Sequence, residues 1–393
     1  MLKFVLRNMN KILFWLGSVI LTAILLVLGS LYMFTDSPSS LMKFLFTYQA
    51  VKENYFHEVT DDVLFEGASN GMVSALDDPH SMILSGDKYE SFMQSTSGEY
   101  GGIGVVIGAD QKNVTRIISV FPGSSAEKNG LQSGDIIKRV NNEDVSALSL
   151  SEVSDRVRGE AGTRVSLLVE RENEEKLFWV ERSNVSMPTV QSRLIDKNIG
   201  YIHIFSFAKH TDEEFEKQLA SIKAQGADRL IIDLRMNPGG LVDTVISIMN
   251  QILTKGRVLS YHTRNGDDRT FDITGIETPL PMVILIDRNS ASASEILAGA
   301  VQDKKEGIII GETSYGKGTV QSVIQNGNKS ALKVSIAEYR TAAGRIIDKT
   351  GITPDIAIKQ TGHVFKQEDD NVLKKAIEVF CLLYTSPSPR DRS

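Results

Sequence analysis

The period of the hydrophobic and polar positions changes along the chain, and each period predicts a different kind of element. Between residues 41 and 93 apolar side chains recur every three or four positions, which predicts amphipathic helices. These side chains are Leu45, Tyr48, Val51, Tyr55, Leu64, Ala68, Met72 and Leu76. Residues 98–182 instead carry short apolar runs between glycine-containing turns, which predicts short strands. From residue 185 onward apolar runs and helical patterns alternate, as in the strand Ile199–Phe207 followed by the helix Asp212–Gln225. This alternation predicts a mixed α/β domain.

The amino terminus has a pattern of its own. Residues Ile12–Phe34 form an uncharged apolar run, with Lys3, Arg7 and Lys11 before it and Asp36 as the first charge after it. At about 1.5 Å per residue, a helix of this length spans the roughly 30 Å hydrocarbon layer of a membrane. We expect an uncleaved anchor, with residues 1–11 in the cytoplasm and the rest of the chain outside. The alternative is a cleaved signal peptide, although no Ala-x-Ala-like cleavage site follows the run soon.

Composition narrows the functional classes. A chain of 393 residues can hold two or three domains, and a net charge of −6 gives no reason to expect nucleic acid as a partner. Cys381 is the single cysteine, so an intramolecular disulfide is excluded. The final run Cys381–Ser393 departs abruptly from the amphipathic pattern before it and resembles a translated sequencing adapter. We therefore expect residues 381–393 to be a non-native tail.

Candidate chemistry is concentrated between Asp287 and Gln321. Three serines open an Ala-rich segment that is expected to be helical, and a lysine between two glycines follows an isoleucine run: Ser290, Ser292, Ser294 and Lys317. A serine at the start of a helix lies near free backbone N–H groups and the positive end of the helix dipole, where negative charge can develop. Because the stretch contains no histidine, the local candidate for a base is Lys317.

Lysine is a poor base at its usual pKa of about 10.4, but burial disfavours its charged form and lowers that pKa. Gly316 and Gly318 would let the amine of Lys317 fit tightly against neighbouring backbone. Gln321 falls on the same face as Lys317 in a helix or a strand, so its amide could orient the amine without adding a counter-ion. The alternative is an ordinary serine helix cap, a surface lysine and loop glycines.

Two short motifs in this stretch resemble those of a known family. Ser290–Glu295 reads SASASE and Gly316–Gln321 reads GKGTVQ. Both runs resemble the signature of the carboxyl-terminal processing proteases, which are Ser-Lys peptidases with an inserted PDZ domain. The resemblance, which extends over residues 41–380, implies that Ser292 is the nucleophile, Lys317 the general base and Gln321 the residue that positions the lysine.

The same resemblance suggests where the oxyanion is bound. The turn Asn237–Gly240 matches the family motif that approaches the nucleophile, and its two glycines offer backbone N–H groups at a helix start. The expected oxyanion hole therefore combines Ala293 with Gly239 or Gly240, and the sequence leaves open which glycine donates. Nearby Asp233 and Arg235 are expected to support this turn rather than to take part in the chemistry.

A second resemblance lies within residues 98–182. Phe121–Val145 resembles the middle of a PDZ domain, and a helix at Ser149–Arg158 would form one wall of its groove. Such a groove adds a peptide strand to its edge and binds the terminal carboxylate with backbone N–H groups. The family's carboxylate-binding loop falls at Gly101, Gly102, Ile103 and Gly104. A plain glycine turn is the alternative at these positions.

Together these observations predict a crotonase-like or ClpP-like spiral peptidase core of the α/β class with an inserted PDZ domain. The expected divisions are 1–11 cytoplasmic, 12–34 transmembrane anchor, 35–97 linker and helical segment, 98–182 PDZ, 183–380 peptidase core and 381–393 tail. The expected function is endoproteolysis of exported proteins by a serine peptidase at a bacterial inner membrane, with the catalytic domain on its periplasmic or extracellular side. Its expected partners are protein substrates with free C-terminal tails and the membrane, and self-association is left open.

Two other classes compete with this interpretation. An inactive PDZ adaptor would bind tails without cutting them, but the intact Ser292, Lys317 and Gln321 argue against it. An acyl-thioester hydratase or isomerase could share the core fold, yet it would need neither a PDZ domain nor an anchor. No metal or cofactor is implied, because the six histidines show no zinc-ligand spacing and the glycine loop Tyr100–Gly108 lacks a dinucleotide-binding context.

Overall fold

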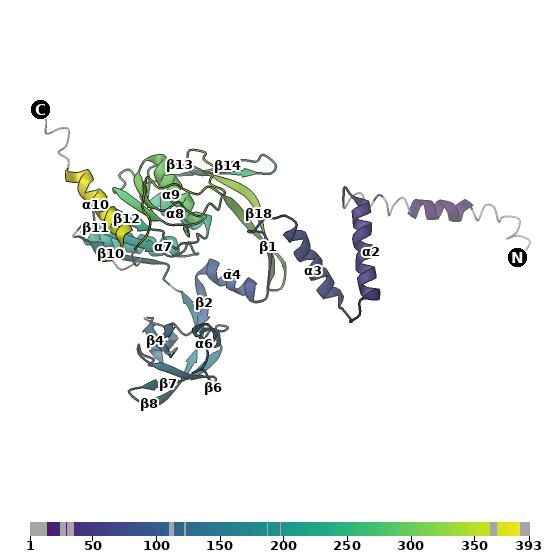
Figure 1. Ribbon diagram of the computed structural model, residues 1–393, viewed down its shortest axis with the longest axis horizontal. Helices are drawn as coiled ribbons and strands as arrows, with labels where there is room; N and C mark the ends of the chain where they lie inside the picture. Colours follow the sequence, from purple (N-terminus) through teal and green to yellow (C-terminus); the bar gives the residue numbers. More distant parts are fainter. Residues whose placement is uncertain are drawn as a thin grey trace, which may run out of the picture. The chain divides into compact units, whose positions relative to one another are not determined.

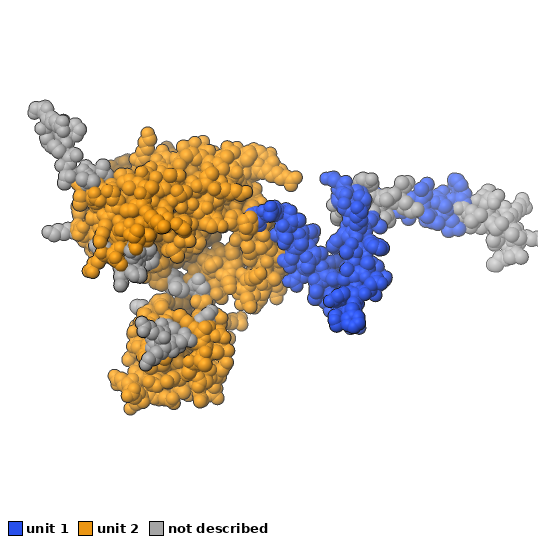
Figure 2. Space-filling model, in the orientation of Figure 1, with its two compact units in different colours: residues 1–78 blue, residues 79–393 orange. Residues whose placement is uncertain are grey.

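The computed structural model describes residues 14–23, 29, 35–109, 114–121, 123–186, 188–196, 198–361 and 368–385. The chain divides into two compact units, residues 1–78 and residues 79–393 (Figure 2). The first unit is helical, whereas the second contains the strands and the candidate site (Figure 1).

The first unit contains α2 (Pro38–Asn54) and α3 (Asp61–Ser74), in agreement with the helical periodicity of this region. Helix α2 begins at a proline, and the Thr60 side chain caps α3 by accepting from the backbone N–H of Val63. Across the two helices the Tyr48 and Phe65 rings stack with their centroids 5.2 Å apart. The structure describes no buried residue in either helix.

The expected membrane anchor falls mostly outside the described residues. Of residues 12–34, only 14–23 and 29 are described, and both segments are helical. No helix in the described part of the chain is both long and apolar enough to cross a membrane. The anchor therefore stays a prediction from the sequence. Residues 386–393 of the expected tail also lie outside the described residues.

The strand-rich region has its own sheet and its own core. Its strands follow the order β3 (Val105–Ala109), β4 (Thr115–Val120), β5 (Ile136–Val140), β7 (Arg164–Arg171) and β8 (Glu174–Glu181), with β6 (Glu143–Asp144) also paired to β5. Helices α5 (Ser125–Lys128) and α6 (Leu150–Val157) pack on it around a separate apolar cluster that includes Ile117, Val153 and Leu167. Strand β2 (Glu99–Gly102) precedes this region in the chain, strand β9 (Ser183–Ser186) follows it, and the two strands pair with each other.

The larger α/β region is built on a six-stranded sheet. Its order is β10 (Val190–Ile195), β11 (Ile199–Ile204), β12 (Arg229–Asp233), β15 (Met282–Ile286), β16 (Gly307–Gly311) and β19 (Ile356–Ala357). Only the β10–β11 pair is antiparallel among these neighbours. The helices that link the parallel strands are α7 (Thr211–Ala224), α8 (Val242–Ile252) and α9 (Ala293–Lys304). The predicted α/β alternation is confirmed, whereas the likeness to a spiral core stays a prediction.

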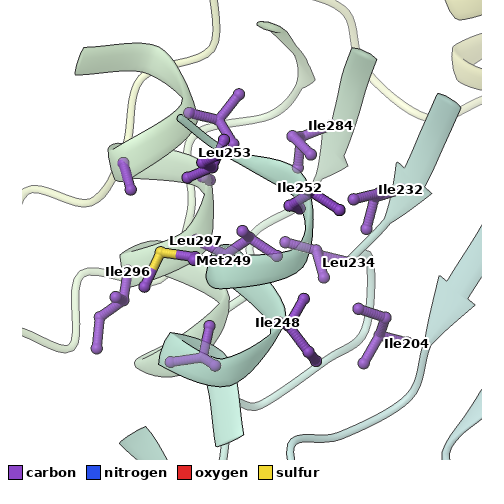
Figure 3. Close-up of a cluster of buried hydrophobic side chains, with 14 of the residues drawn as sticks. Ile204, Ile232, Leu234, Ile248, Met249, Ile252, Leu253, Ile284, Ile296 and Leu297 are labelled. Atoms are coloured by element: carbon purple, nitrogen blue, oxygen red, sulfur yellow. The ribbon is translucent and has the colours of Figure 1, made fainter. Parts of the chain in front are cut away.

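Both faces of this sheet are covered, so its strands are almost continuously apolar. Side chains of even-numbered positions on β12 and β15, such as Ile232 and Ile284, lie against α8 and α9 (Figure 3). The same apolar cluster includes residues of α7. The alternate positions, such as Ile231 and Leu285, pack with α10 (Asn371–Thr385) on the opposite face. The sheet is therefore the middle layer of three.

A second, antiparallel sheet completes the α/β region. It has the order β1 (Met82–Ser85), β18 (Ser330–Thr341), β13 (Gly256–Thr263) and β14 (Arg269–Ile273), and β17 (Thr319–Gly327) pairs with β18. Residues 82–85 were expected to be helical, but they form a strand because β18, about 250 residues later, supplies a partner for its backbone. Helix α4 (Asp87–Ser97) follows it and ends at Gly98 in the left-handed conformation.

Candidate active site

The candidate nucleophile lies where β15 leads into α9. Ser292 immediately precedes α9 and has φ 55° and ψ −113°, a conformation that is strained for a residue with a side chain. It is half-buried, whereas Ser290 and Ser294 on either side are fully buried. The three serines of the SASASE motif therefore have different surroundings, and only the middle one reaches solvent.

The turn at residues 290–294, here called the nucleophile turn, is bonded to the segment that follows β12 through its two flanking serines. The Ser290 hydroxyl donates to the carbonyl of Leu234 at 2.8 Å, and the Ser294 hydroxyl donates to the carbonyl of Asn237 at 3.0 Å. The backbone N–H of Ala291 also donates to the Asn237 carbonyl, at 3.1 Å. These bonds connect the nucleophile turn to the turn Asn237–Gly240, as the sequence motif led us to expect.

Gly239 makes the closest approach between the two turns. A Cβ atom at this position would lie 2.6 Å from the Ala291 oxygen, 2.8 Å from the Ser292 Cβ and 2.9 Å from the Ala293 nitrogen. The N–H of Gly239 donates to the Asn237 side-chain oxygen at 2.8 Å. Within the described part of the chain, the N–H groups of Gly240 and Ala293 have no backbone or side-chain acceptor. Gly240 is exposed, while Gly239 is buried.

The loop at residues 314–318, here called the lysine loop, carries Lys317 and lies beside the nucleophile turn. Lys317 is half-buried between the buried residues Gly316 and Gly318. A Cβ atom on Gly318 would come within 2.5 Å of the Asp348 nitrogen, and one on Gly316 within 3.0 Å of the Thr350 nitrogen. The two glycines therefore allow residues 348–350 to approach the lysine loop closely, as their lack of side chains suggested.

Two buried side chains contact the backbones of both Ser292 and Lys317. The Glu295 carboxylate accepts from the backbone N–H groups of Ser292 at 2.8 Å and Lys317 at 2.9 Å. The Tyr339 hydroxyl lies 3.1 Å from the Ser292 carbonyl oxygen and 2.5 Å from the Lys317 carbonyl oxygen. Burial raises the pKa of the Glu295 carboxyl, although its hydrogen bonds act in the opposite direction. The backbones of the two candidate catalytic residues are thus held together by two shared partners.

Gln321 lies on β17, four residues after Lys317. Its amide nitrogen donates to the Thr319 hydroxyl at 2.9 Å, to the Thr319 carbonyl at 3.1 Å and to the Ser335 hydroxyl at 3.2 Å. The nitrogen end of the amide is therefore anchored to its own strand and to β18. This leaves the amide oxygen as the end that can accept from an amine.

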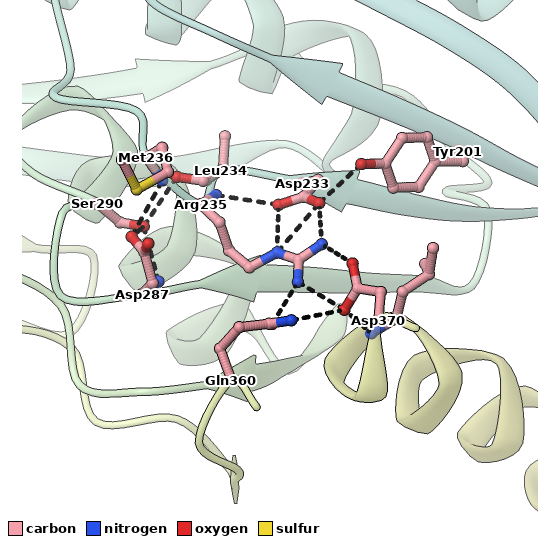
Figure 4. A network of polar contacts seen from close by, with 10 residues as sticks. Tyr201, Asp233, Leu234, Arg235, Met236, Asp287, Ser290, Gln360 and Asp370 are labelled. Atoms are coloured by element: carbon pink, nitrogen blue, oxygen red, sulfur yellow. Dashed lines mark hydrogen bonds and ion pairs between the residues drawn. The ribbon is translucent and has the colours of Figure 1, made fainter. Parts of the chain in front are cut away.

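A buried ion-pair network surrounds Arg235, two residues before the turn Asn237–Gly240 (Figure 4). Arg235, only 1% exposed, donates to Asp233, to Gln360 at 2.8 Å and to both carboxylate oxygens of Asp370 at 2.8 and 2.7 Å. Tyr201 donates to Asp233 at 2.7 Å. Burial alone would raise the pKa of the Asp370 carboxyl, but the hydrogen bonds and charge of Arg235 outweigh it and hold that pKa below its usual range. These contacts join Asp233 and Arg235 to each other and to Asp370, and their support of the turn stays a prediction.

A groove of about 430 Å³ lies between β3 and α6 in the strand-rich region. Three of the four residues predicted to bind a carboxylate line it, namely Gly102, Ile103 and Gly104. The fourth, Gly101, is absent from its lining, and a Cβ atom there would lie 2.1 Å from the Gly159 oxygen. Gly101 is thus needed for backbone packing. The opposite wall includes Leu150, Ser154 and Val157 of α6.

The sequence motifs do not predict the roles of Glu295 and Tyr339 beside Ser292 and Lys317, or the pairing of Asp370 with Arg235. Glu295 was noticed only as the last letter of its motif, although a glutamate three residues after a helix-capping serine is a known signal for a bond back to the cap. Tyr339 and Asp370 lie far from the motifs in the chain, and no local pattern marks them. Among the described residues, no group of His, Cys, Asp or Glu side chains is arranged to hold a metal ion.

Comparison with known proteins gives consistent matches. Residues 198–358 match the model of peptidase family S41, residues 91–170 the PDZ domain, and residues 30–87 the N-terminal domain of the activating protease CtpB. The carboxy-terminal-processing protease of Bartonella bacilliformis is 33% identical over 89% of this chain and 83% of its own length. The carboxy-terminal processing protease CtpB of Bacillus subtilis is 35% identical over 80% of this chain and 66% of its own length.

Solved structures resemble the chain at the level of the fold. A candidate S41 protease from Bacteroides fragilis matches with a TM-score of 0.52 and 16% identity, over 84% of this chain and 92% of its own. The photosystem II D1 C-terminal processing protease matches with a TM-score of 0.48 and 27% identity, over 80% of this chain and 86% of its own.

Proposed function

The chain belongs to the carboxy-terminal processing proteases of peptidase family S41, and from this premise we propose that Ser292 and Lys317 form its catalytic dyad, assisted by Gln321. It is a serine-type peptidase with a PDZ domain. The observation that carries the dyad is the shared binding of the Ser292 and Lys317 backbones by Glu295 and Tyr339. The strained backbone of Ser292, which is typical of functional positions, supports it further.

In the proposed mechanism the neutral amine of Lys317 takes the proton from the Ser292 hydroxyl as its oxygen attacks the scissile carbonyl carbon. The Gln321 amide oxygen orients that amine. The resulting ammonium then donates its proton to the leaving amine, and the peptide bond breaks. A water molecule, deprotonated by the same lysine, hydrolyses the acyl-enzyme and releases Ser292.

The negative oxygen of the tetrahedral intermediate needs two aligned donors. We assign these to the backbone N–H groups of Ala293 and Gly240. The bond from Gly239 to the Asn237 side chain favours Gly240, because it already occupies the other glycine's N–H group. The role of Gly239 is then to let the two turns approach each other.

Replacement of the dyad tests this proposal. Ser292→Ala and Lys317→Ala should each lower kcat by about 1,000-fold or more, since either change removes a group that acts only in the reaction. The measurement is cleavage of an unfolded protein substrate by the full chain, with fragments identified by mass spectrometry. Lys217→Ala is a matched control, because Lys217 is exposed on α7 and is not among the contacts of the candidate site. Near-normal cleavage by Lys317→Ala would reject the dyad.

We further propose that the PDZ groove binds the free C-terminal tail of an exported protein substrate. Its edge strand β3 can pair with an added strand, and its glycine-containing loop offers backbone N–H groups to a carboxylate. The proposed division of the chain places the PDZ domain at 98–182 and the peptidase core at 183–380. An inactive adaptor is not favoured, because Ser292, Lys317 and Gln321 are all present.

Finally, we propose that residues 12–34 anchor the enzyme in a bacterial inner membrane with its peptidase core outside the cytoplasm. The support is the uncharged apolar run with basic residues on its amino-terminal side. Mass spectrometry of the protein isolated from membranes should find residues 12–34 still attached. A mature amino terminus near Thr35 would instead identify a cleaved signal peptide.

A further inference from the structure

We propose that Glu295 is a positioning residue of the peptidase, whose carboxylate fixes the nucleophile turn and the lysine loop relative to each other. The inference rests on the proposed Ser292–Lys317 dyad and adds to it a residue that never touches the substrate. The Glu295 carboxylate takes no part in bond making or breaking, but it would set the geometry that the reaction requires.

The contacts of this carboxylate come from two segments of the chain. On the nucleophile side, its Oε2 atom accepts from the Ser292 N–H at 2.8 Å. On the lysine side, Oε2 also accepts from the Lys317 N–H at 2.9 Å, while Oε1 accepts from the Gly316 N–H at 2.7 Å and the Ser314 hydroxyl at 2.6 Å. One rigid group therefore bonds to the backbone of both proposed catalytic residues through a single oxygen atom.

A helix cap alone would not need this arrangement. A neutral serine or asparagine caps a helix well, whereas a fully buried carboxylate has a large desolvation cost. Four hydrogen bonds offset that cost here, and three of the four donors belong to the lysine loop. A carboxylate is the only common side chain that can accept from four donors without presenting a donor of its own.

Tyr339 acts on the opposite side of the same pair of residues. Its hydroxyl contacts the carbonyl oxygens of Ser292 and Lys317, and its backbone N–H donates to the Gly318 carbonyl at 2.8 Å. Glu295 therefore holds the N–H side of both residues while Tyr339 holds the C=O side. If the backbone of either Ser292 or Lys317 rotated, it would lose its bonds to Glu295 and Tyr339. Because the other residue is bonded to the same two side chains, the two backbones are fixed relative to each other.

The test replaces Glu295 by glutamine in the full chain. Whichever way the amide is placed, its NH₂ group faces donors that now lack an acceptor, so the two segments shift apart. We expect kcat to fall about 100-fold, the effect of a displacement of about 1 Å at a catalytic pair, with KM nearly unchanged. Labelling of Ser292 by a fluorophosphonate probe should slow by a similar factor. Thermal unfolding of each variant is measured in parallel.

Glu214→Gln is the matched control. Glu214 also accepts from a hydroxyl and two backbone N–H groups, those of Thr189 and Val190, but it joins α7 to β10 and is not among the contacts of the candidate site. We expect this variant to lose stability and keep its kcat. If Glu295→Gln and Glu214→Gln lower stability alike and both keep kcat, Glu295 is only structural and the inference fails.

Tyr339→Phe keeps the test decisive should Glu295→Gln fail to fold, because it deletes only one hydroxyl. We expect about a tenfold loss of kcat and of labelling rate, corresponding to about 1.4 kcal/mol. Normal kinetics of Tyr339→Phe would overturn the inference on their own. Ser292→Ala and Lys317→Ala, assayed alongside, distinguish a failure of the dyad from a failure of the positioning role. Full activity in these two variants rejects the dyad. If they are inactive while Glu295→Gln has normal kinetics, only the positioning role is rejected.

Discussion

Gly239 illustrates how much of the candidate site depends on a single missing side chain. Its φ of 99° and its position against the Ala291 oxygen and the Ser292 Cβ leave no space for even a methyl group. Without such a residue, the turn that brings Gly240 could not pack against the nucleophile turn. The lack of a side chain at Gly239 therefore determines how closely the two turns approach each other at the candidate site.

We therefore predict that Gly239→Ala abolishes most activity. The added Cβ would force the Asn237–Gly240 turn away from Ser292, and a shift of about 1 Å costs about 100-fold in rate. Gly266→Ala separates this crowding from backbone strain, because Gly266 also has positive φ, at 78°, but a Cβ there meets nothing within 4 Å. The control should lose about 1 kcal/mol of stability and keep its kcat. Equal kcat losses in both variants would contradict the prediction.

Helix α10 is joined to the sheet by apolar packing and by one ion pair. Val372, Leu373 and Phe380 pack on the face of the sheet opposite α9, and Asp370, directly before the helix, binds Arg235 through both carboxylate oxygens. Asp370 also accepts from the Leu373 N–H at 3.0 Å and so caps the helix. The same Arg235 lies two residues before the turn Asn237–Gly240, so this ion pair joins the start of α10 to the segment that leads into the turn.

Asp370→Asn should lower the free energy of unfolding by about 3 kcal/mol, because it removes the charge that faces a buried guanidinium. The folded-state pKa of Asp370 is below its unfolded value, so its contribution to stability is complete above the unfolded pKa of about 3.9 and is lost as pH falls through the folded pKa. Urea unfolding between pH 7 and pH 2 should show the wild type approaching the variant in acid. Asp228→Asn, whose side chain is 61% exposed in its pair with Arg229, should change stability much less at any pH.

At the scale of the whole molecule, the PDZ region and the peptidase region have separate hydrophobic cores. The PDZ cluster contains Ile103, Val153 and Leu167, whereas the peptidase clusters are formed by other residues. We therefore expect a single substitution on the surface of the groove to leave the peptidase core intact. This independence lets the proposed role of the groove be tested without changing the catalytic residues.

Leu150→Asp should raise KM about tenfold for a protein substrate with a free C-terminal carboxylate, because it places a negative charge in the groove wall. The same substrate with an amidated C-terminus should already have the higher KM and should not respond to the substitution. Leu177→Asp is the control, since Leu177 is 59% exposed on β8 of the same domain and does not line the groove. An unchanged KM for the free-tail substrate would argue against tail recognition.

The sequence was sufficient where a property depends on neighbouring residues. The periodic apolar positions predicted the helices of the first unit and the α/β alternation of the core, and two unbroken motifs pointed to the family. It was insufficient at Met82–Ser85, where the partner strand lies about 250 residues away. It was also insufficient for Tyr339, whose contacts with the Ser292 and Lys317 carbonyls form only when β18 packs against α9, and for Asp370, which pairs with Arg235 from 135 residues away.

The sequence by itself determined the family, the layered pairing of strands with helices and the candidate dyad, because these follow from local periodicity and from short motifs. Only the tertiary structure decided how the motifs combine. It placed Ser290 and Ser294 in buried hydrogen bonds and left Ser292 half-exposed. It paired the N–H of Gly239 with the Asn237 side chain, and it brought the Glu295 carboxylate to the backbones of both Ser292 and Lys317. Such outcomes depend on which groups find partners when distant segments are packed and water is excluded, and no single stretch of the chain carries that information.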